Sequence, residues 1–223
     1  MAQLQAVDIP APHGRLEGLL RLPDAAEGPP RMAAVVCHAL PTAGGTMHFK
    51  AVFRIAQALG QIGMPVLRFN FRGVGRSTGT FDEGRGEADD VRAALDELAR
   101  RYPELPLCVA GFSFGAKVGL PVGCADARVQ QVIGAGVPVE LLDVDTLAGC
   151  AKPKLIVQGE RDQYGPPPRL RDWYARLSEP KALVVVPAAD HFFTDQLSQL
   201  AEALLAYFRS GASALGPLPD MRG

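Results

Sequence analysis

The chain has 223 residues and a nearly balanced charge, with 23 Lys and Arg against 24 Asp and Glu. This length suits one α/β domain with a sizeable core, and the balanced charge gives no electrostatic reason to expect nucleic acid or an anionic membrane as a partner. The sequence shows neither a signal-peptide pattern nor an apolar stretch near the roughly 20 residues that span a membrane. The four cysteines, Cys37, Cys108, Cys124 and Cys150, have no metal-binding spacing and suit reducing conditions. We therefore expect a cytoplasmic protein whose partner is a small molecule.

Two short extended segments, 4–9 and 14–22, open the chain and flank a proline-containing turn, which predicts an antiparallel hairpin at the edge of a sheet. Continuous apolar runs follow, and such runs are typical of strands that are buried on both faces of a parallel sheet. These strands are predicted at 32–37, 65–70, 107–110, 129–133, 154–158 and 181–186. Helices are predicted at about 50–59, 116–124, 140–147 and 195–208. Two more are predicted, one that the acidic stretch 82–90 leads into and that ends at about 101, and one that begins at the proline run 166–168 and ends at about 177.

Strands and helices that alternate in this way favour an α/β fold. We expect a mostly parallel central sheet, with the antiparallel N-terminal hairpin at one edge and helices on both faces. We assign residues 1–212 to a single domain because the sequence contains no internal repeat and no second core. Residues 213–223 are rich in Gly, Ala and Pro and are expected to form a flexible tail.

The run Gly111-Phe112-Ser113-Phe114-Gly115 joins a predicted strand to a predicted helix. A G-x-S-x-G motif at such a junction holds its serine on a sharp turn, and the small flanking residues let strand and helix approach closely. The dipole and first N–H groups of the helix face the same space and can stabilise an oxyanion. The motif alone is common, and its alternative reading is a glycine-flanked turn with a capping serine. Ser113 is our candidate nucleophile.

A serine nucleophile needs a base, and the base needs an acid that orients it. His191 follows the last predicted strand and is the candidate base, and Asp162 follows the strand before it and is the candidate acid. Glu160, in the same loop, is the alternative acid. His38 ends the first central strand and is the alternative base, although a histidine in that position is more often a hydrogen-bonded loop anchor. The order Ser, Asp, His is the one expected of an α/β-hydrolase.

The loop 38–47 follows a central strand, and ligands of open α/β sheets bind outside the carboxyl ends of strands. An oxyanion hole needs two N–H donors, and Phe114 at the start of the helix supplies one of them. The second comes from Ala39 or Leu40 because Pro41 has no N–H, and we favour Leu40.

Together these blocks resemble the α/β-hydrolase superfamily, and more narrowly its small, lidless bacterial serine hydrolases that are similar to dienelactone hydrolases with serine in place of cysteine. The narrower resemblance rests on His38 with Pro41 and 44–47, on LRFNFRGVGRS at 67–77, on GFSFG at 111–115 and on HFF at 191–193. It implies esterase-type activity. Members usually carry proline after the first histidine, where this chain has Ala39.

We therefore expect a serine carboxylesterase that cleaves small soluble acyl esters through an acyl-enzyme on Ser113, with no metal and no cofactor. The segment 134–152 has room for only about one short helix, so no lid domain is expected and the site is open. The alternatives are an acyltransferase, thioesterase or amidase of the same fold and, from another class, a non-catalytic small-molecule binding module. The acyl chain length and the oligomeric state, monomer or homodimer, are left open.

Overall fold

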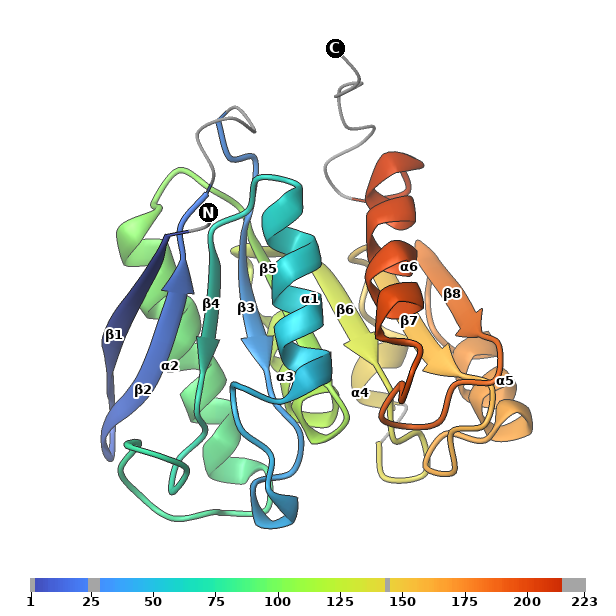
Figure 1. The fold of residues 1–223 in the computed structure, drawn as a ribbon, viewed down its shortest axis with the longest axis horizontal. Helices are drawn as coiled ribbons and strands as arrows, with labels where there is room; N and C mark the ends of the chain where they lie inside the picture. Colours follow the sequence, from blue (N-terminus) through green and yellow to red (C-terminus); the bar gives the residue numbers. More distant parts are fainter. Residues whose placement is uncertain (1–2, 24–28, 143–144, 214–223) are drawn as a thin grey trace.

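The computed structural model describes residues 3–23, 29–142 and 145–213, so the predicted tail lies almost entirely outside the described residues. An eight-stranded sheet runs through the molecule in the order β1-β2-β4-β3-β5-β6-β7-β8 (Figure 1). The strands are β1 (Leu4–Ala11), β2 (Gly14–Arg21), β3 (Ala33–Cys37), β4 (Val66–Phe69), β5 (Leu107–Phe112), β6 (Val129–Ala135), β7 (Lys154–Gly159) and β8 (Lys181–Val186).

The pairing of these strands confirms the predicted sheet. β1 and β2 form an antiparallel hairpin in which Leu4 lies opposite Arg21, and β2 pairs antiparallel with β4. All remaining neighbours are parallel. Every residue of β3, β4, β5 and β7 is buried, as expected for strands covered on both faces.

Helices cover both faces of the sheet, also as predicted. In Figure 1, α1 and α6 lie in front of the sheet, while α2 and α3 lie behind it. Two apolar clusters fill these layers, one including Ile55 of α1 and Leu204 of α6, the other including Val91 of α2 and Val118 of α3. None of the helices in the described part of the chain is long and apolar enough to cross a membrane. The helices are α1 (Lys50–Gln61), α2 (Arg85–Arg101), α3 (Phe114–Ala125), α4 (Asp145–Ala148), α5 (Pro167–Ala175) and α6 (Leu197–Arg209), with a 3-10 turn η2 (Pro41–Ala43).

Two helices differ from their predicted ranges. The helix predicted at 140–147 is only the short α4, because the chain after Pro138 turns instead, with the N–H of Leu141 bonded to the Pro138 carbonyl. The last helix begins at Leu197 rather than at Asp195, because Asp195 has a φ of 60°, which a right-handed helix cannot accommodate.

Cys124 at the end of α3 and Cys150 after α4 form a disulfide whose Cα atoms are 5.6 Å apart. The expectation that reducing conditions suit all four cysteines is therefore wrong for this pair. The sequence could not indicate the pairing, because the two cysteines are 26 positions apart and the segment between them carries no pattern that brings its ends together. Cys37 and Cys108 are free and buried in the core strands, as predicted.

The parallel strands point toward the lower edge of the sheet in Figure 1, where several long loops gather. Ser113 follows β5, Asp162 lies beyond β7, and His191 lies beyond β8. The fold therefore brings three loops that are distant in sequence to the same edge, which is where open α/β sheets bind their ligands.

Candidate active site

Ser113 occupies a strained turn between β5 and α3. Its φ of 55° and ψ of −118° lie in a region that residues with a side chain rarely adopt. The turn is held by hydrogen bonds from the N–H of Ser113 to the Ala135 carbonyl, 3.0 Å, and from the N–H of Ala116 to the Ser113 carbonyl, 2.9 Å. These contacts present the hydroxyl at the end of the sheet.

The two glycines of the G-x-S-x-G motif allow close backbone contacts. A Cβ on Gly111 would clash with the backbone of Gly115, and a Cβ on Gly115 would clash with the carbonyl groups of Cys37 and His38. Gly115 therefore lets the start of α3 lie directly against the end of β3. This contact sets the distance between the serine turn and the loop that was predicted to supply an oxyanion donor.

Replacing Gly115 with Ala is expected to lower kcat/KM for a short-chain ester by about 100-fold, because it pushes the loop after β3 away from the serine turn. Gly149→Ala is the matched control, since an added Cβ there meets no atom within 4 Å. Ester hydrolysis assays on both variants check the prediction. Equal activities of the two variants would contradict it.

A continuous chain of hydrogen bonds joins the three predicted side chains. The Nε2 atom of His191 lies 2.8 Å from the Oγ atom of Ser113. The Nδ1 atom of His191 lies 2.8 Å from the Oδ2 atom of Asp162. His191 is 3% exposed and Asp162 is 1% exposed, so the histidine–carboxylate pair is shielded from water. A serine, an imidazole and a carboxylate connected in this way can activate the serine hydroxyl.

Asp162 is held by three further donors. The backbone N–H groups of Tyr164 and Gly165 donate to its Oδ1 atom, at 2.8 and 3.2 Å, and the Nε2 atom of Gln158 donates to its Oδ2 atom at 2.7 Å. The carboxylate therefore has a single orientation, with Oδ2 toward His191.

Gln158 was not recognised as a site residue from the sequence. It is fully buried, and its amide group forms two hydrogen bonds with the backbone of Val137: it accepts from the N–H at 2.8 Å and donates to the carbonyl at 3.2 Å. Gln158 thereby links Asp162 to the segment after β6. The available signal was a polar residue at the end of the apolar strand, four positions before the acid.

The alternative acid and base have other partners. Glu160 accepts a hydrogen bond from the N–H of Ala188 at an exposed position. His38 is fully buried, donates from Nδ1 to the Ala39 carbonyl at 2.7 Å and accepts at Nε2 from the N–H of Phe71 at 3.0 Å. Both ring nitrogens are thus occupied, which confirms His38 as a hydrogen-bonded loop anchor.

Burial lowers the pKa of His38 from 6.5 to about 4, so the ring is neutral in the folded protein. The unfolded chain takes up a proton at His38 as the pH falls below 6.5, whereas the folded chain does so only near pH 4. The stability that this neutral ring contributes is therefore present above pH 6.5 and is lost between those two values, by about 3 kcal/mol in total.

We expect the His38→Gln variant to be less stable than the native protein at neutral pH, and this difference in unfolding free energy to shrink toward about pH 4.5. Urea unfolding of both proteins at neutral pH and at about pH 4.5 measures this difference in unfolding free energy. The same difference at both values would show that the protonation of His38 is not linked to folding.

The backbone N–H groups of Leu40 and Phe114 donate to no acceptor among the described residues. The N–H of Ser113 itself is used by Ala135 and is not available. Ala39 also has an unused N–H, so the choice of Leu40 over Ala39 stays a prediction. These unused donors, close to the serine turn, suit the recognition of a negatively charged oxygen.

The loop before α1 is held by two side chains from the end of β4. Asn70 accepts the N–H of Met47 at 2.8 Å, and Arg68 donates to the Met47 carbonyl at 2.9 Å. The guanidinium of Arg68 also lies over the ring of Phe53, 5.3 Å from its centroid. The loop that carries Leu40 is therefore fixed at both ends, by β3 and by β4.

The phenylalanines on either side of Ser113 share a turn but pack in different parts of the core. Both are buried, but Phe112 belongs to the cluster beneath α1 and α6, and Phe114 to the cluster beneath α2 and α3. Phe112 ends a strand and Phe114 begins a helix, so the sharp turn between them directs the two rings to opposite faces of the sheet.

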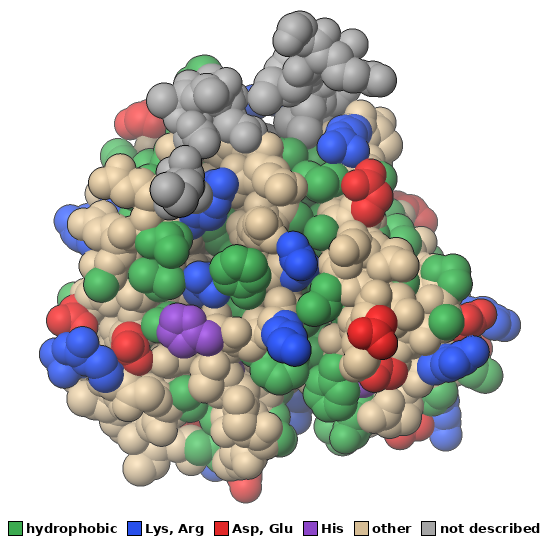
Figure 2. Space-filling view, in the orientation of Figure 1, with side chains coloured by type: hydrophobic (Ala, Val, Ile, Leu, Met, Phe, Trp, Pro, Cys, Tyr) green, Lys and Arg blue, Asp and Glu red, His purple; other side chains and the backbone are tan. Residues whose placement is uncertain are grey.

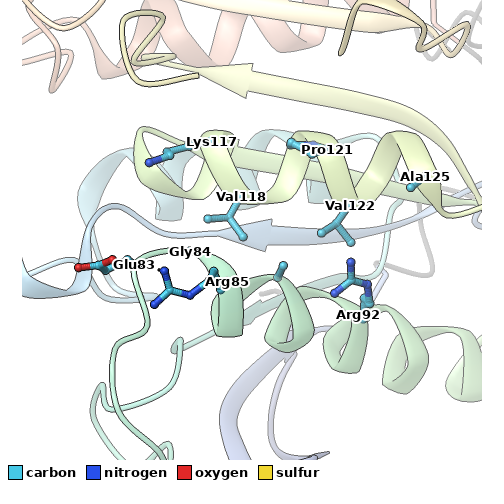
Figure 3. A pocket seen from close by; sticks show the side chains of 10 residues that line it. Glu83, Gly84, Arg85, Arg92, Lys117, Val118, Pro121, Val122 and Ala125 are labelled. Carbon is cyan, nitrogen blue, oxygen red and sulfur yellow. Dashed lines mark hydrogen bonds and ion pairs between the residues drawn. The ribbon is translucent and has the colours of Figure 1, made fainter. Parts of the chain in front are cut away.

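A surface hollow of about 310 Å³ lies elsewhere, between α2 and α3 (Figure 3). Val118 and Pro121 of α3 line it, with Arg85 and Arg92 of α2 facing them. Ser113, Asp162 and His191 do not line this hollow. Within the described ranges, no three His, Cys, Asp or Glu side chains are grouped as a metal ion would require.

Comparison with known proteins gives consistent matches. A protein of Rickettsia prowazekii, described as uncharacterized, is 33% identical over 205 residues, which are 88% of this chain and 85% of the relative. A solved structure from Xanthomonas campestris, described as an α/β serine hydrolase without a lid, is 37% identical, with a TM-score of 0.86 over 93% of this chain and 94% of that chain. An α/β serine hydrolase homologue from Coxiella burnetii is 36% identical, with a TM-score of 0.83 over 91% and 96%.

A dienelactone hydrolase from Anabaena variabilis shares the fold, with a TM-score of 0.76 at 22% identity over 93% of this chain and 97% of that chain. The family model described as an alpha/beta hydrolase domain matches residues 31–204, from the loop before β3 into α6. The family resemblance of the sequence blocks is therefore confirmed, and the chain belongs to the α/β-hydrolase family.

Proposed function

We propose that this protein is a carboxylesterase that hydrolyses small soluble esters through an acyl-enzyme on Ser113. The observation that carries the proposal is the chain of two 2.8 Å hydrogen bonds from Ser113 through His191 to Asp162. A turn that only capped a helix would not need a buried imidazole and a buried carboxylate behind its serine.

In the proposed reaction, Oγ of Ser113 attacks the ester carbonyl carbon while Nε2 of His191 takes the hydroxyl proton. Asp162 keeps the Nδ1–H of His191 oriented and stabilises the imidazolium. The N–H groups of Phe114 and Leu40 stabilise the negative charge on the carbonyl oxygen. The bond to the alcohol oxygen then breaks, and His191 gives its proton to that oxygen.

Water completes the reaction on the acyl-enzyme. His191 takes a proton from water, the resulting hydroxyl attacks the acyl carbon, and the carboxylic acid leaves as Ser113 regains its proton. Each step uses only side chains and N–H groups of this chain. An acyltransferase would differ only in the nucleophile that replaces water.

The short connection between β6 and β7 supports the preference for small soluble substrates. Its one described helix is the four-residue α4, and a lidless serine hydrolase is among the similar structures. A site without a lid does not need a lipid surface to open it.

The proposal is tested by labelling with a fluorophosphonate probe and by hydrolysis of p-nitrophenyl esters from acetate to octanoate. We expect labelling at Ser113 and the highest kcat/KM on the short esters. Labelling with turnover only on matched thioesters or amides would favour those variants of the fold. A protein that neither labels nor hydrolyses any of them would be a binding module.

A further inference from the structure

Two aromatic side chains lie edge-on against the His191 ring. The ring of Tyr164 is 4.6 Å away at 61°, and the ring of Phe192 is 5.1 Å away at 79°. Tyr164 is 47% exposed and Phe192 is 45% exposed, whereas Phe112, which also contacts His191, is fully buried. The imidazole therefore has a buried ring beneath it and two rings that face solvent beside it.

Hydrogen bonds hold the backbone of the two residues that carry the exposed rings. The N–H of Tyr164 donates to Asp162, and the N–H of Phe192 donates to Asp190 at 3.0 Å. The Phe192 ring also lies 6.1 Å from that of Phe49. Figure 2 shows hydrophobic side chains gathered between the lower ends of α1 and α6, at the end of the sheet where the parallel strands finish. These rings form a partly exposed apolar surface beside His191.

The position of His191 determines which part of a substrate reaches this surface. During acylation, Nε2 must protonate the alcohol oxygen, so that oxygen lies within hydrogen-bond distance of the imidazole. The carbonyl oxygen instead faces the N–H groups of Leu40 and Phe114. The acyl chain takes the remaining direction. Of the three substituents on the reacting carbon, the alcohol is the one held next to His191, and Tyr164 and Phe192 are neighbours of that ring.

We infer that Tyr164 and Phe192 select esters whose alcohol part carries an aromatic ring, such as benzyl esters. This inference rests on the proposed function. The chemistry is the acylation already described: the Oγ–acyl bond forms, the bond to the alcohol oxygen breaks, and the proton on His191 passes to the departing alcohol. The aromatic ring of the alcohol stacks on Tyr164 and Phe192 while this happens.

The test compares kcat/KM for benzyl acetate and ethyl acetate. The two alcohols have similar acidity, so their intrinsic reactivity does not create a large preference. We expect the native protein to prefer benzyl acetate, and Tyr164→Ala and Phe192→Ala each to reduce this preference by about fivefold. Tyr164→Phe keeps the ring and should keep the preference. Leu4→Ala, which removes a 52% exposed apolar side chain from the far edge strand, is the control.

The deacylation rate separates substrate selection from a structural role. Both acetates give the same acetyl-enzyme, from which the alcohol has already left. Its hydrolysis, measured by stopped flow, therefore reports on His191 without any contribution from alcohol binding. An unchanged benzyl preference in both Ala variants would overturn the inference. A parallel loss on both esters together with slower deacylation would also overturn it, because the rings would then only support His191. Activity on ethyl acetate without a native benzyl preference would overturn the inference but leave the proposed function intact.

Discussion

Replacing Ser113 with Ala is expected to lower kcat for a short-chain ester by at least about 10⁴-fold. The substitution removes the oxygen that is proposed to form the acyl-enzyme, while the backbone contacts of the turn remain. The N–H groups of Leu40 and Phe114 are still present, so a small residual activity over water is expected. The comparison uses p-nitrophenyl acetate with native and variant protein.

Two further measurements make the Ser113→Ala result decisive. The variant should unfold at nearly the same temperature as the native protein, since Ala has the same Cβ and the turn keeps its hydrogen bonds to Ala135 and Ala116. It should also lose all labelling by a fluorophosphonate. A stable variant that still turned over the ester at the native rate would refute Ser113 as the nucleophile.

The Asp162→Asn variant is expected to lose about 10⁴-fold in kcat, with little change in KM. The N–H groups of Tyr164 and Gly165 require an acceptor at the Oδ1 position, so the new amide oxygen faces them. The new NH₂ group then points toward His191 and toward the Nε2 donor of Gln158. His191 must accept at Nδ1 and carry its proton on Nε2, where it can no longer take the proton of Ser113.

Gln158 cannot relieve this conflict by turning its amide. Its Oε1 atom accepts from the N–H of Val137 and its Nε2 atom donates to the Val137 carbonyl. If the amide were reversed, its NH₂ group would face that N–H and its oxygen would face that carbonyl, and both hydrogen bonds would be lost. Asp162→Asn should therefore also lower the melting temperature. Glu160→Gln is the matched control in the same loop, with activity expected within about twofold of native. An active Asp162→Asn variant beside an inactive Glu160→Gln variant would reverse the assignment of the acid.

Some of the site could be predicted because its signals are local. The G-x-S-x-G run specifies a tight strand-to-helix turn through two glycines that no larger residue can replace, as the contacts of Gly111 and Gly115 show. The apolar run before each loop identifies a buried strand, and the chain order places Asp162 and His191 after strands that end at one edge. The spacing of apolar residues and the size of the side chains within about ten positions were sufficient for these predictions.

Other features depend on residues that meet only in the folded chain. The contact of Gln158 with Val137, the disulfide of Cys124 with Cys150 and the ring of Tyr164 beside His191 join separate segments. The late start of the helix predicted at 140–147, which begins only at Asp145, belongs here as well.

The sequence by itself therefore determined the sheet, the order of the three candidate residues and the turn that holds Ser113, because each depends on the conformational preferences of a short segment. The tertiary structure alone decided what holds Asp162 and what surrounds His191. Those contacts are set by where β6, β7 and β8 end relative to one another, and strand pairing fixes that register only after the chain has folded.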